Sequence, residues 1–181
     1  SVDAQSPKLS DKLLTWTANG AVYAYDLDTG TSLGVISAPQ TTNYEPRVSG
    51  SYIAWSGADN SDSEIFLWDG TTGTTGTRTP VTNNSIDDRR VQIDGSNLVW
   101  EGIDPQSNTY EVYLYRAGPG GSATPLRLTQ NTTDEKDPQI SGNNVVWTGW
   151  DGANWQIYYR AIDTMAPAPN ISNTKVLNDR P

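Results

Sequence analysis

The sequence predicts an all-β protein in which one small antiparallel sheet is repeated four times. No stretch repeats apolar residues at helical spacing, and 16 Gly and 11 Pro punctuate the 181 residues. Short β-branched and aromatic runs recur between Gly, Asn and Asp turns, which is typical of strands. The clearest of these runs are 52–55, 64–68, 97–100 and 112–115.

A ten-residue phrase that ends in tryptophan returns four times and defines the repeat. The four copies are PKLSDKLLTW, PRVSGSYIAW, VQIDGSNLVW and PQISGNNVVW, which end at Trp16, Trp55, Trp100 and Trp147. The gaps between these tryptophans are 39, 45 and 47 residues. A Ser-Gly or Asp-Gly pair inside the phrase predicts a hairpin turn, so the phrase holds a short first strand and a longer second strand.

Two further strands follow each phrase. The third strands are expected at Val22–Tyr25, Ile65–Trp68, Val112–Tyr115 and Ile157–Arg160, and the weaker fourth strands at Leu33–Ile36, Thr79–Thr82, Pro125–Thr129 and Thr174–Leu177. A four-stranded antiparallel unit of about 40 to 45 residues is the period of a propeller blade. We therefore expect a β-propeller-like array of four antiparallel four-stranded blades. It forms one domain over residues 1–181, with blades at about 7–45, 46–90, 91–137 and 138–181.

The third strands indicate how such sheets are arranged. Ile65 and Leu67 point to one face of their strand, whereas Phe66 and Trp68 point to the other, and both faces are apolar. A strand of this kind must be covered on both sides. In a radial stack each blade lies between two neighbours, which buries both faces.

At these residues the chain resembles the TolB-like β-propeller repeats. Blades of that family carry a Pro-x-Ile-Ser-x-(Asp/Gly)-Gly type turn, an apolar strand, an Ile-Tyr-x-Tyr type strand and a closing Leu-Thr. The likeness extends from Pro7 to Pro181, with Trp where the family often has Phe and Ser-Gly where it often has Ser-Pro-Asp-Gly. Such propellers serve as periplasmic scaffolds, sugar-processing enzymes and peptidase appendages, so the resemblance implies an architecture and leaves the activity open.

The resemblance also implies rings of six or more blades more often than four. Pro7 and Pro181 occupy equivalent positions in the repeat, so no blade is shared between the two termini. Three arrangements are compatible with this pattern: a closed four-bladed ring, a fragment or engineered piece of a larger propeller, and a half-ring completed by self-association. An open arc exposes the apolar faces of its end blades, and we expect such a protein not to be monomeric.

Composition restricts the chemistry. The chain has no His and no Cys, which excludes Ser-His-Asp and Cys-His catalysis and the side chains of most zinc and copper sites. Carboxylates remain for acid-base chemistry or Ca²⁺, and Lys or Tyr for β-elimination. With 21 acidic against 12 basic residues we expect no nucleic-acid partner, and no apolar run reaches the roughly 20 residues of a membrane span.

Trp150, Asp151 and Trp155 form the candidate ligand site. The four phrase-ending tryptophans recur and are assigned to packing, as is Trp68, whereas Trp150 and Trp155 have no counterpart and fall in the loop between the second and third strands. Asp151-Gly152 predicts a tight turn that brings the two indoles together. Two interpretations remain: the rings stack on each other and staple the hairpin, or they form a platform on which a sugar or peptide binds beside Asp151.

Acidic turns before each first strand form a second candidate. They comprise Asn43 with Glu45, Asp87-Asp88, Asp134-Glu135 with Asp137, and Asn178-Asp179. Their repetition favours turn capping on a soluble surface, and a ring mouth that binds cations is the alternative. Residues 59–64 place oxygen donors at alternate positions, but they lack the central Gly and the twelve-residue loop of a strong Ca²⁺ motif. We assign no metal site and expect no cofactor other than, at most, Ca²⁺.

These observations favour a non-enzymatic binding or scaffold module for protein or glycan partners, with homo-oligomerisation through open blade faces as an option. The Thr, Ser, Asn and Gly-rich acidic composition is typical of extracellular or periplasmic proteins. The alternative is a carbohydrate-active enzyme, either a carboxylate glycosidase or a polysaccharide lyase. We assign no catalytic residue, because most acids fall in repeated turns and a lyase is expected to use His or a metal.

Overall fold

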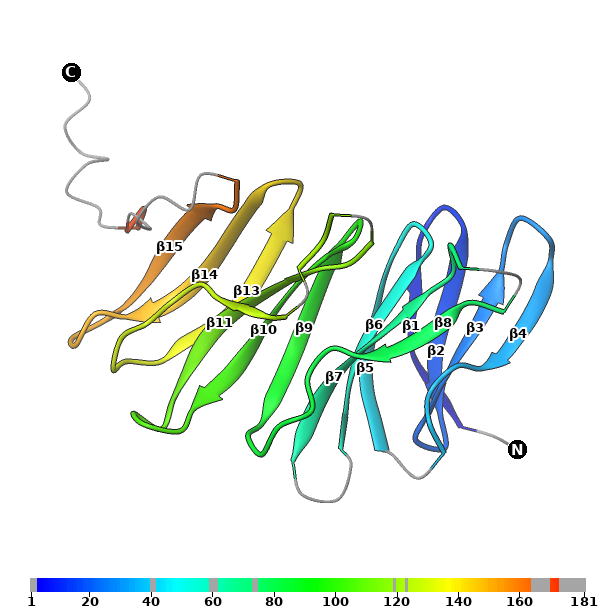
Figure 1. Cartoon of the computed structure of the whole chain (residues 1–181), viewed down its shortest axis with the longest axis horizontal. Helices are drawn as coiled ribbons and strands as arrows, with labels where there is room; N and C mark the ends of the chain where they lie inside the picture. Colours follow the sequence, from blue (N-terminus) through cyan, green and yellow to red (C-terminus); the bar gives the residue numbers. More distant parts are fainter. Residues whose placement is uncertain are drawn as a thin grey trace.

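The structure, a computed structural model, describes residues 3–39, 42–58, 62–72, 75–118, 120–122, 124–163 and 170–172. Over these ranges the chain forms four antiparallel sheets that stand side by side (Figure 1). The predicted all-β fold and the array of four blades are therefore confirmed. Among the described residues, no helical segment has the length and hydrophobicity that a membrane crossing demands.

Each sheet takes its strands in chain order, so the blades follow one another along the sequence. Blade 1 contains β1 (Ala4–Leu9), β2 (Leu13–Ala18), β3 (Ala21–Asp26) and β4 (Thr31–Val35), and blade 2 contains β5 (Thr42–Ser49), β6 (Tyr52–Ala58), β7 (Ser63–Asp69) and β8 (Thr77–Pro80). Blade 3 contains β9 (Asp88–Asp94), β10 (Asn97–Asp104), β11 (Thr109–Arg116) and β12 (Leu126–Arg127), and blade 4 contains β13 (Glu135–Ser141), β14 (Asn144–Trp150) and β15 (Trp155–Ala161).

Residues 170–172 supply the outer edge of blade 4. The Ile171 amide donates to the Ile157 carbonyl (2.8 Å), and the Ile157 amide donates to Ser172 Oγ (2.7 Å). Val81 and Thr82 make the same two bonds to Ile65 in blade 2, both at 2.8 Å. An apolar residue followed by a hydroxyl residue thus closes each blade. The fourth strand expected at Thr174–Leu177 lies outside the described residues.

A β-bulge interrupts the first strand of every blade at one position. The residue ten places before each phrase-ending tryptophan has a positive φ of 44° to 54° although none is glycine; these residues are Ser6, Glu45, Arg90 and Asp137. The strand register shifts at the same place in all four sheets, so two residues oppose the tryptophan where a regular ladder has one. The bulge bends the first strand around the indole.

That bend lets the first strand accept a hydrogen bond from the tryptophan ring. The indole Nε1 of Trp55 donates to Asn43 Oδ1 (2.8 Å), and that of Trp100 donates to Asp88 Oδ1 (2.7 Å). In blade 4 the Trp147 indole donates to Glu135 Oε2 (2.5 Å). Each acceptor lies twelve residues before its tryptophan. Blade 1 has Ala4 at this position, which offers no side-chain acceptor to Trp16.

Each of these indoles also lies flat on the aromatic ring directly across the strand pair. The stacked pairs are Trp16–Tyr23, Trp55–Phe66, Trp100–Tyr113 and Trp147–Tyr158, with ring centroids 5.5 to 6.1 Å apart. The predicted packing role is confirmed for Trp55 and Trp100, which are fully buried, and for Trp147, which is nearly so, whereas Trp16 is only partly buried. Trp68 is buried as well.

The hydrophobic cores lie between blades rather than within them. Ile65 and Leu67 pack against blade 3, while Phe66 and Trp68 pack against blade 1, as the alternation predicts. The blades lie in an open row, with blades 1 and 4 at opposite ends (Figure 1). The closed four-bladed ring is therefore excluded, and the described chain is an arc.

We predict that Gly102→Ala destabilises the fold by about 1 to 3 kcal/mol. A methyl group at Gly102 would meet the Asp88 carboxylate and lie 2.8 Å from the Tyr113 ring, both of which the Trp100 indole holds in place. Urea denaturation followed by tryptophan fluorescence measures the loss. An unchanged free energy of unfolding would show that the packing around Trp100 is loose. Ala18 stands at the equivalent site of blade 1, where Ala4 replaces the bulky acceptor.

Candidate functional site

The two candidate tryptophans lie on strands, not in a loop as expected. Trp150 ends β14 and Trp155 begins β15, and they face each other as the last pair of that ladder. Ile103 and Tyr110 occupy the same place in blade 3. The interpretation that the pair has no counterpart was therefore wrong, because connections of different length hid the equivalent positions.

The geometry of the pair combines mutual packing with exposure. The Trp150 and Trp155 ring centroids are 5.3 Å apart with the planes at 63°, an edge-to-face contact. Trp155 nevertheless remains 48% exposed. Lys136 Nζ lies 5.0 Å from the Trp155 ring centroid and 2.6 Å from the Asp134 carboxylate. One indole is thus held in place by the other and by a cation, and keeps an open surface.

Asp151 builds the turn that carries the pair. Its Oδ1 accepts bonds from the Ala153 amide (2.8 Å) and the Asn154 amide (2.7 Å), and its Oδ2 accepts from Gln156 Nε2 (3.0 Å). These hydrogen bonds, led by those from the backbone, lower the pKa of Asp151. The predicted tight turn is confirmed, and both oxygens of the carboxylate are engaged in holding it.

A hollow of about 570 Å³ opens beside the indole pair at the seam between blades 3 and 4. Its lining is Asn108, Thr109, Thr132, Thr133, Asp134, Trp150 and Trp155. Hydroxyl, amide and carboxylate groups therefore surround two aromatic rings. The hollow lies at the end of the blades where the second strand turns into the third, which we call the hairpin face.

The cation beside Trp155 has an equivalent in the neighbouring blade. The Arg89 guanidinium lies 3.8 Å from the Tyr110 ring centroid, and Lys136 reaches to 5.8 Å from the same ring. Arg89 and Lys136 each follow the indole acceptor of their blade, and Tyr110 and Trp155 are equivalent in the ladders. The hairpin face thus carries a row of alternating cations and aromatic rings across the seam, which the sequence analysis did not find.

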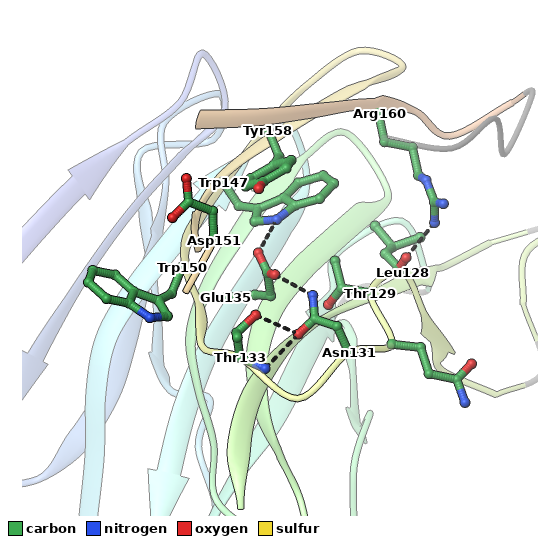
Figure 2. Close-up of a pocket in the computed structure, with 11 residues that line it drawn as sticks. Leu128, Thr129, Asn131, Thr133, Glu135, Trp147, Trp150, Asp151, Tyr158 and Arg160 are labelled. Carbon is green, nitrogen blue, oxygen red and sulfur yellow. Dashed lines mark hydrogen bonds between the residues drawn. The ribbon is translucent and has the colours of Figure 1, made fainter. Parts of the chain in front are cut away.

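A second hollow of about 430 Å³ is lined by Trp147, Trp150 and Glu135, among others. Figure 2 shows the carboxylate between Trp147 and Asn131. Oε2 accepts from the Trp147 indole, and Oε1 accepts from Asn131 Nδ2 (2.5 Å). Burial raises the pKa of Glu135 to about 7 in spite of these bonds. A buried acid of this kind in a hollow has the properties of a general acid.

The repeats give Glu135 a structural role instead. In blade 3 Asp88 binds Asn84 and Trp100 in the same way, and burial raises the pKa of Asp88 as well. In blade 2 the neutral Asn43 takes this place. The position therefore requires a hydrogen-bond acceptor for an indole and does not require an ionisable group.

The acidic turns are only partly as expected. Asp88 and Glu135 are buried within the first strands and hold tryptophans, so the expectation that they cap surface turns was wrong. Their neighbours Asp87 and Asp134 do cap. Each accepts a 3.0 Å bond from a backbone amide near the start of the third strand of the preceding blade, Ser63 for Asp87 and Tyr110 for Asp134. Within the described ranges no acidic cluster is arranged as a metal site. Asn178-Asp179 and residues 59–61 of the candidate Ca²⁺ stretch lie outside the described residues.

Glu101 is a further singular residue that the sequence analysis missed. Its carboxylate is fully buried and accepts bonds from Arg89 Nε (3.1 Å), Arg90 Nη1 (3.2 Å) and the Asp137 amide (2.7 Å). The other blades have Thr17, Ser56 and Thr148 at this position, directly after the tryptophan. Comparing the four repeats at this one position would have revealed Glu101. Glu101 therefore joins the first strand of blade 3 to the first strand of blade 4, beside the cation and aromatic row.

The fold is that of β-propeller domains. The chain superposes on Porphyromonas gingivalis dipeptidyl peptidase 4 with a TM-score of 0.66 and 12% identity, covering 93% of this chain and 26% of that one. For the β-propeller domain of the Trilobed protease from Pyrococcus furiosus the TM-score is 0.61 and the identity 11%, covering 94% and 57%. For the Dos1 propeller the values are 0.60 and 14%, covering 90% and 45%.

These likenesses establish the architecture and no activity. The chain spans about a quarter of the peptidase and about half of the two propellers. No family model and no curated protein sequence matches it. Membership of the TolB-like family therefore stays a prediction.

We predict that Glu135→Gln removes part of the pH dependence of stability. The pKa of Glu135 is about 7 in the folded chain against an ordinary 4.5, so the unfolded chain releases this proton first as the pH rises. The native protein therefore loses stability from about pH 4.5 and the loss is complete above about pH 7, where it totals about 3 kcal/mol. The variant should lack this decline, because glutamine keeps an acceptor for Trp147 without an ionisable group.

Urea titrations between pH 4 and pH 8 would measure the difference in free energy of unfolding between variant and native protein. As the pH rises, the free energy of unfolding of the variant should increase relative to that of the native protein. Glu45→Gln changes the net charge equally at an exposed site and serves as the control. Parallel curves for the native protein and Glu135→Gln would contradict the assignment.

Proposed function

We propose that this chain is a non-enzymatic β-propeller module that binds glycans at the hairpin face, on the seam between blades 3 and 4. One observation carries the proposal: Trp155 remains 48% exposed beside a polar hollow while Trp150 and Lys136 fix its ring. A rigid exposed indole costs little entropy to order when a ligand arrives. The composition supports an extracellular or periplasmic location, where glycans are available ligands.

The chemistry of the hollow suits a sugar. The C–H face of a pyranose packs on an indole. The hydroxyls of the sugar then need hydrogen-bond donors and acceptors close to that indole. Asn108, Thr109 and Thr132 offer both at the rim. Asp134 accepts from hydroxyls, and its charge is balanced by Lys136. The hollow therefore favours a neutral saccharide over an acidic one.

A carboxylate enzyme is the weaker alternative. Glu135 has a raised pKa, as general acids do, but its carboxylate already accepts hydrogen bonds from Trp147 and Asn131. Asp151, the other acid in the lining of the same hollow, accepts the hydrogen bonds that hold its turn. A glycosidase needs two carboxylates that face the scissile bond. Asp88 holds the tryptophan of blade 3 as Glu135 holds that of blade 4, so Glu135 has a structural role that does not involve catalysis.

We predict that Trp155→Ala weakens glycan binding by about tenfold or more, equivalent to about 1.4 kcal/mol or more. The variant removes the stacking surface and leaves the turn at Asp151 in place. A glycan array identifies the ligand, and isothermal titration calorimetry compares the dissociation constants. Trp150→Ala should weaken binding to a lesser degree, because it removes the ring that orients Trp155 and part of the lining but leaves the exposed indole itself in place.

Tyr44→Ala is the matched control. Tyr44 is 47% exposed near the start of a first strand in blade 2, so its removal takes away a comparable aromatic surface from another seam. Binding should be unchanged in this variant. Equal losses in Tyr44→Ala and Trp155→Ala, or unchanged binding in both, would refute the proposed site.

A further inference from the structure

Each seam between blades joins two different faces. On the face turned toward the next blade, which we call the forward face, lie alternate residues of the third strand and the apolar residue that closes the blade. On the opposite back face lie the phrase-ending tryptophan and its stacked partner. In blade 2, for example, Ile65 and Val81 pack forward on blade 3, while Trp55 packs back on blade 1.

The forward face of blade 4 is left uncovered. Ile157 is 39% exposed and Ile171 is 52% exposed. Their equivalents in the other three blades are at most 8% exposed; these are Val22 and Ile36, Ile65 and Val81, and Val112 and Leu128. The side chains of blade 4 are therefore of the type that a seam buries, but no blade lies against them in the arc.

The back face of blade 1 is uncovered in the same way. Leu9 is 67% exposed, whereas its equivalents Val48, Ile93 and Ile140 pack in seams. Trp16 is only partly buried, although the other phrase-ending tryptophans are buried. The arc thus ends in one free forward face and one free back face, which are the two halves of a seam.

Polar groups at the rims of the seams agree with this pairing. Ser10 Oγ donates to the Gly50 carbonyl of the next blade (2.9 Å), and the Gly95 amide donates to Ser49 Oγ (2.8 Å). Ser141 of blade 4 occupies the position of Ser10 and Ser49, and Asp11 of blade 1 occupies the position of Gly50 and Gly95.

A second polar pair follows the same logic. Arg47 Nε donates to Gln92 Oε1 of the next blade at 3.2 Å. All four blades have a polar residue at this position, Gln139 in blade 4 and Lys8 in blade 1, so in a seam between blade 4 and a blade 1 Gln139 would take the place of Arg47 and Lys8 that of Gln92. A cation and an amide would therefore meet again where blade 4 joins a blade 1.

We propose that a second copy of this chain docks head to tail, with its blade 1 on the forward face of blade 4, and that two arcs close one ring through two such seams. An interface between unlike faces closes a ring or grows into a filament, according to the rotation that each junction adds. The arc spans about half of two known propellers, which favours closure by two copies. This inference does not depend on the proposed glycan site.

Light scattering and sedimentation equilibrium over a concentration series test the proposal on the 181-residue protein. Each chain has a net charge of −9, so the buffer should contain about 0.15 M salt to screen repulsion. The mass should rise to twice 19.7 kDa and stay there. A mass of 19.7 kDa at every concentration up to the solubility limit would overturn the proposal, and growth beyond the dimer would overturn ring closure.

Two charged variants test the faces. Ile157→Glu should disable the forward face and Leu9→Glu the back face, so each variant alone should be monomeric. Leu126→Glu is the control, because Leu126 is 42% exposed on the outer strand of an internal blade, and it should remain dimeric. Circular dichroism and the melting temperature establish that the variants are folded.

Mixing the two variants distinguishes the head-to-tail seam from a symmetric one. The Leu9→Glu arc keeps its forward face and the Ile157→Glu arc keeps its back face, so the mixture contains one intact seam and should form a weaker heterodimer. A symmetric contact between two blades 4 would instead leave Leu9→Glu dimeric on its own, and mixing it with Ile157→Glu would produce no heterodimer. Dimers that persist in both single variants would also overturn the proposal.

Discussion

The hydrogen bond from a buried indole to the first strand is the interaction on which the rest of the structure depends. An indole N–H without a partner is costly inside a core, so each internal tryptophan requires an acceptor nearby. Asn43, Asp88 and Glu135 provide it. They reach the indole because the first strand bulges opposite the tryptophan, and the bulge occurs in all four blades.

This constraint also links one blade to the next. Glu64 accepts from the Asn84 amide, Asn84 donates to Asp88, and Asp88 accepts from Trp100. Glu111, Asn131, Glu135 and Trp147 repeat the series at the following seam. The connecting segment is therefore held to the blade that it leaves and to the blade that it enters. The two carboxylates of each series are buried and the asparagine between them is exposed, which explains why an acidic chain places carboxylates in its interior.

The seam between blades 3 and 4 departs from the repeat, and the proposed ligand site lies there. Glu101 replaces a hydroxyl residue and gathers two arginines, while Trp150 and Trp155 replace smaller residues at the end of the hairpin. None of these side chains belongs to the hydrophobic cores between blades. Side chains that break the repeat outside the cores are those that a binding function explains best.

The local sequence determined the strands, the period and the alternation of faces, because these follow from the spacing of apolar residues and turns within about 45 residues. It also determined that Trp55 packs and that Trp150 and Trp155 meet across a turn. It did not determine that Asp88 and Glu135 are buried acceptors, because nothing in a turn-like acidic pair reveals a bulge that folds it beneath an indole twelve residues away. The tertiary structure alone decided that the four blades form an open arc, since the exposure of Ile157 and Leu9 depends on whether another blade covers them. Local periodicity specifies a blade, and only the packing of whole blades decides which faces remain free.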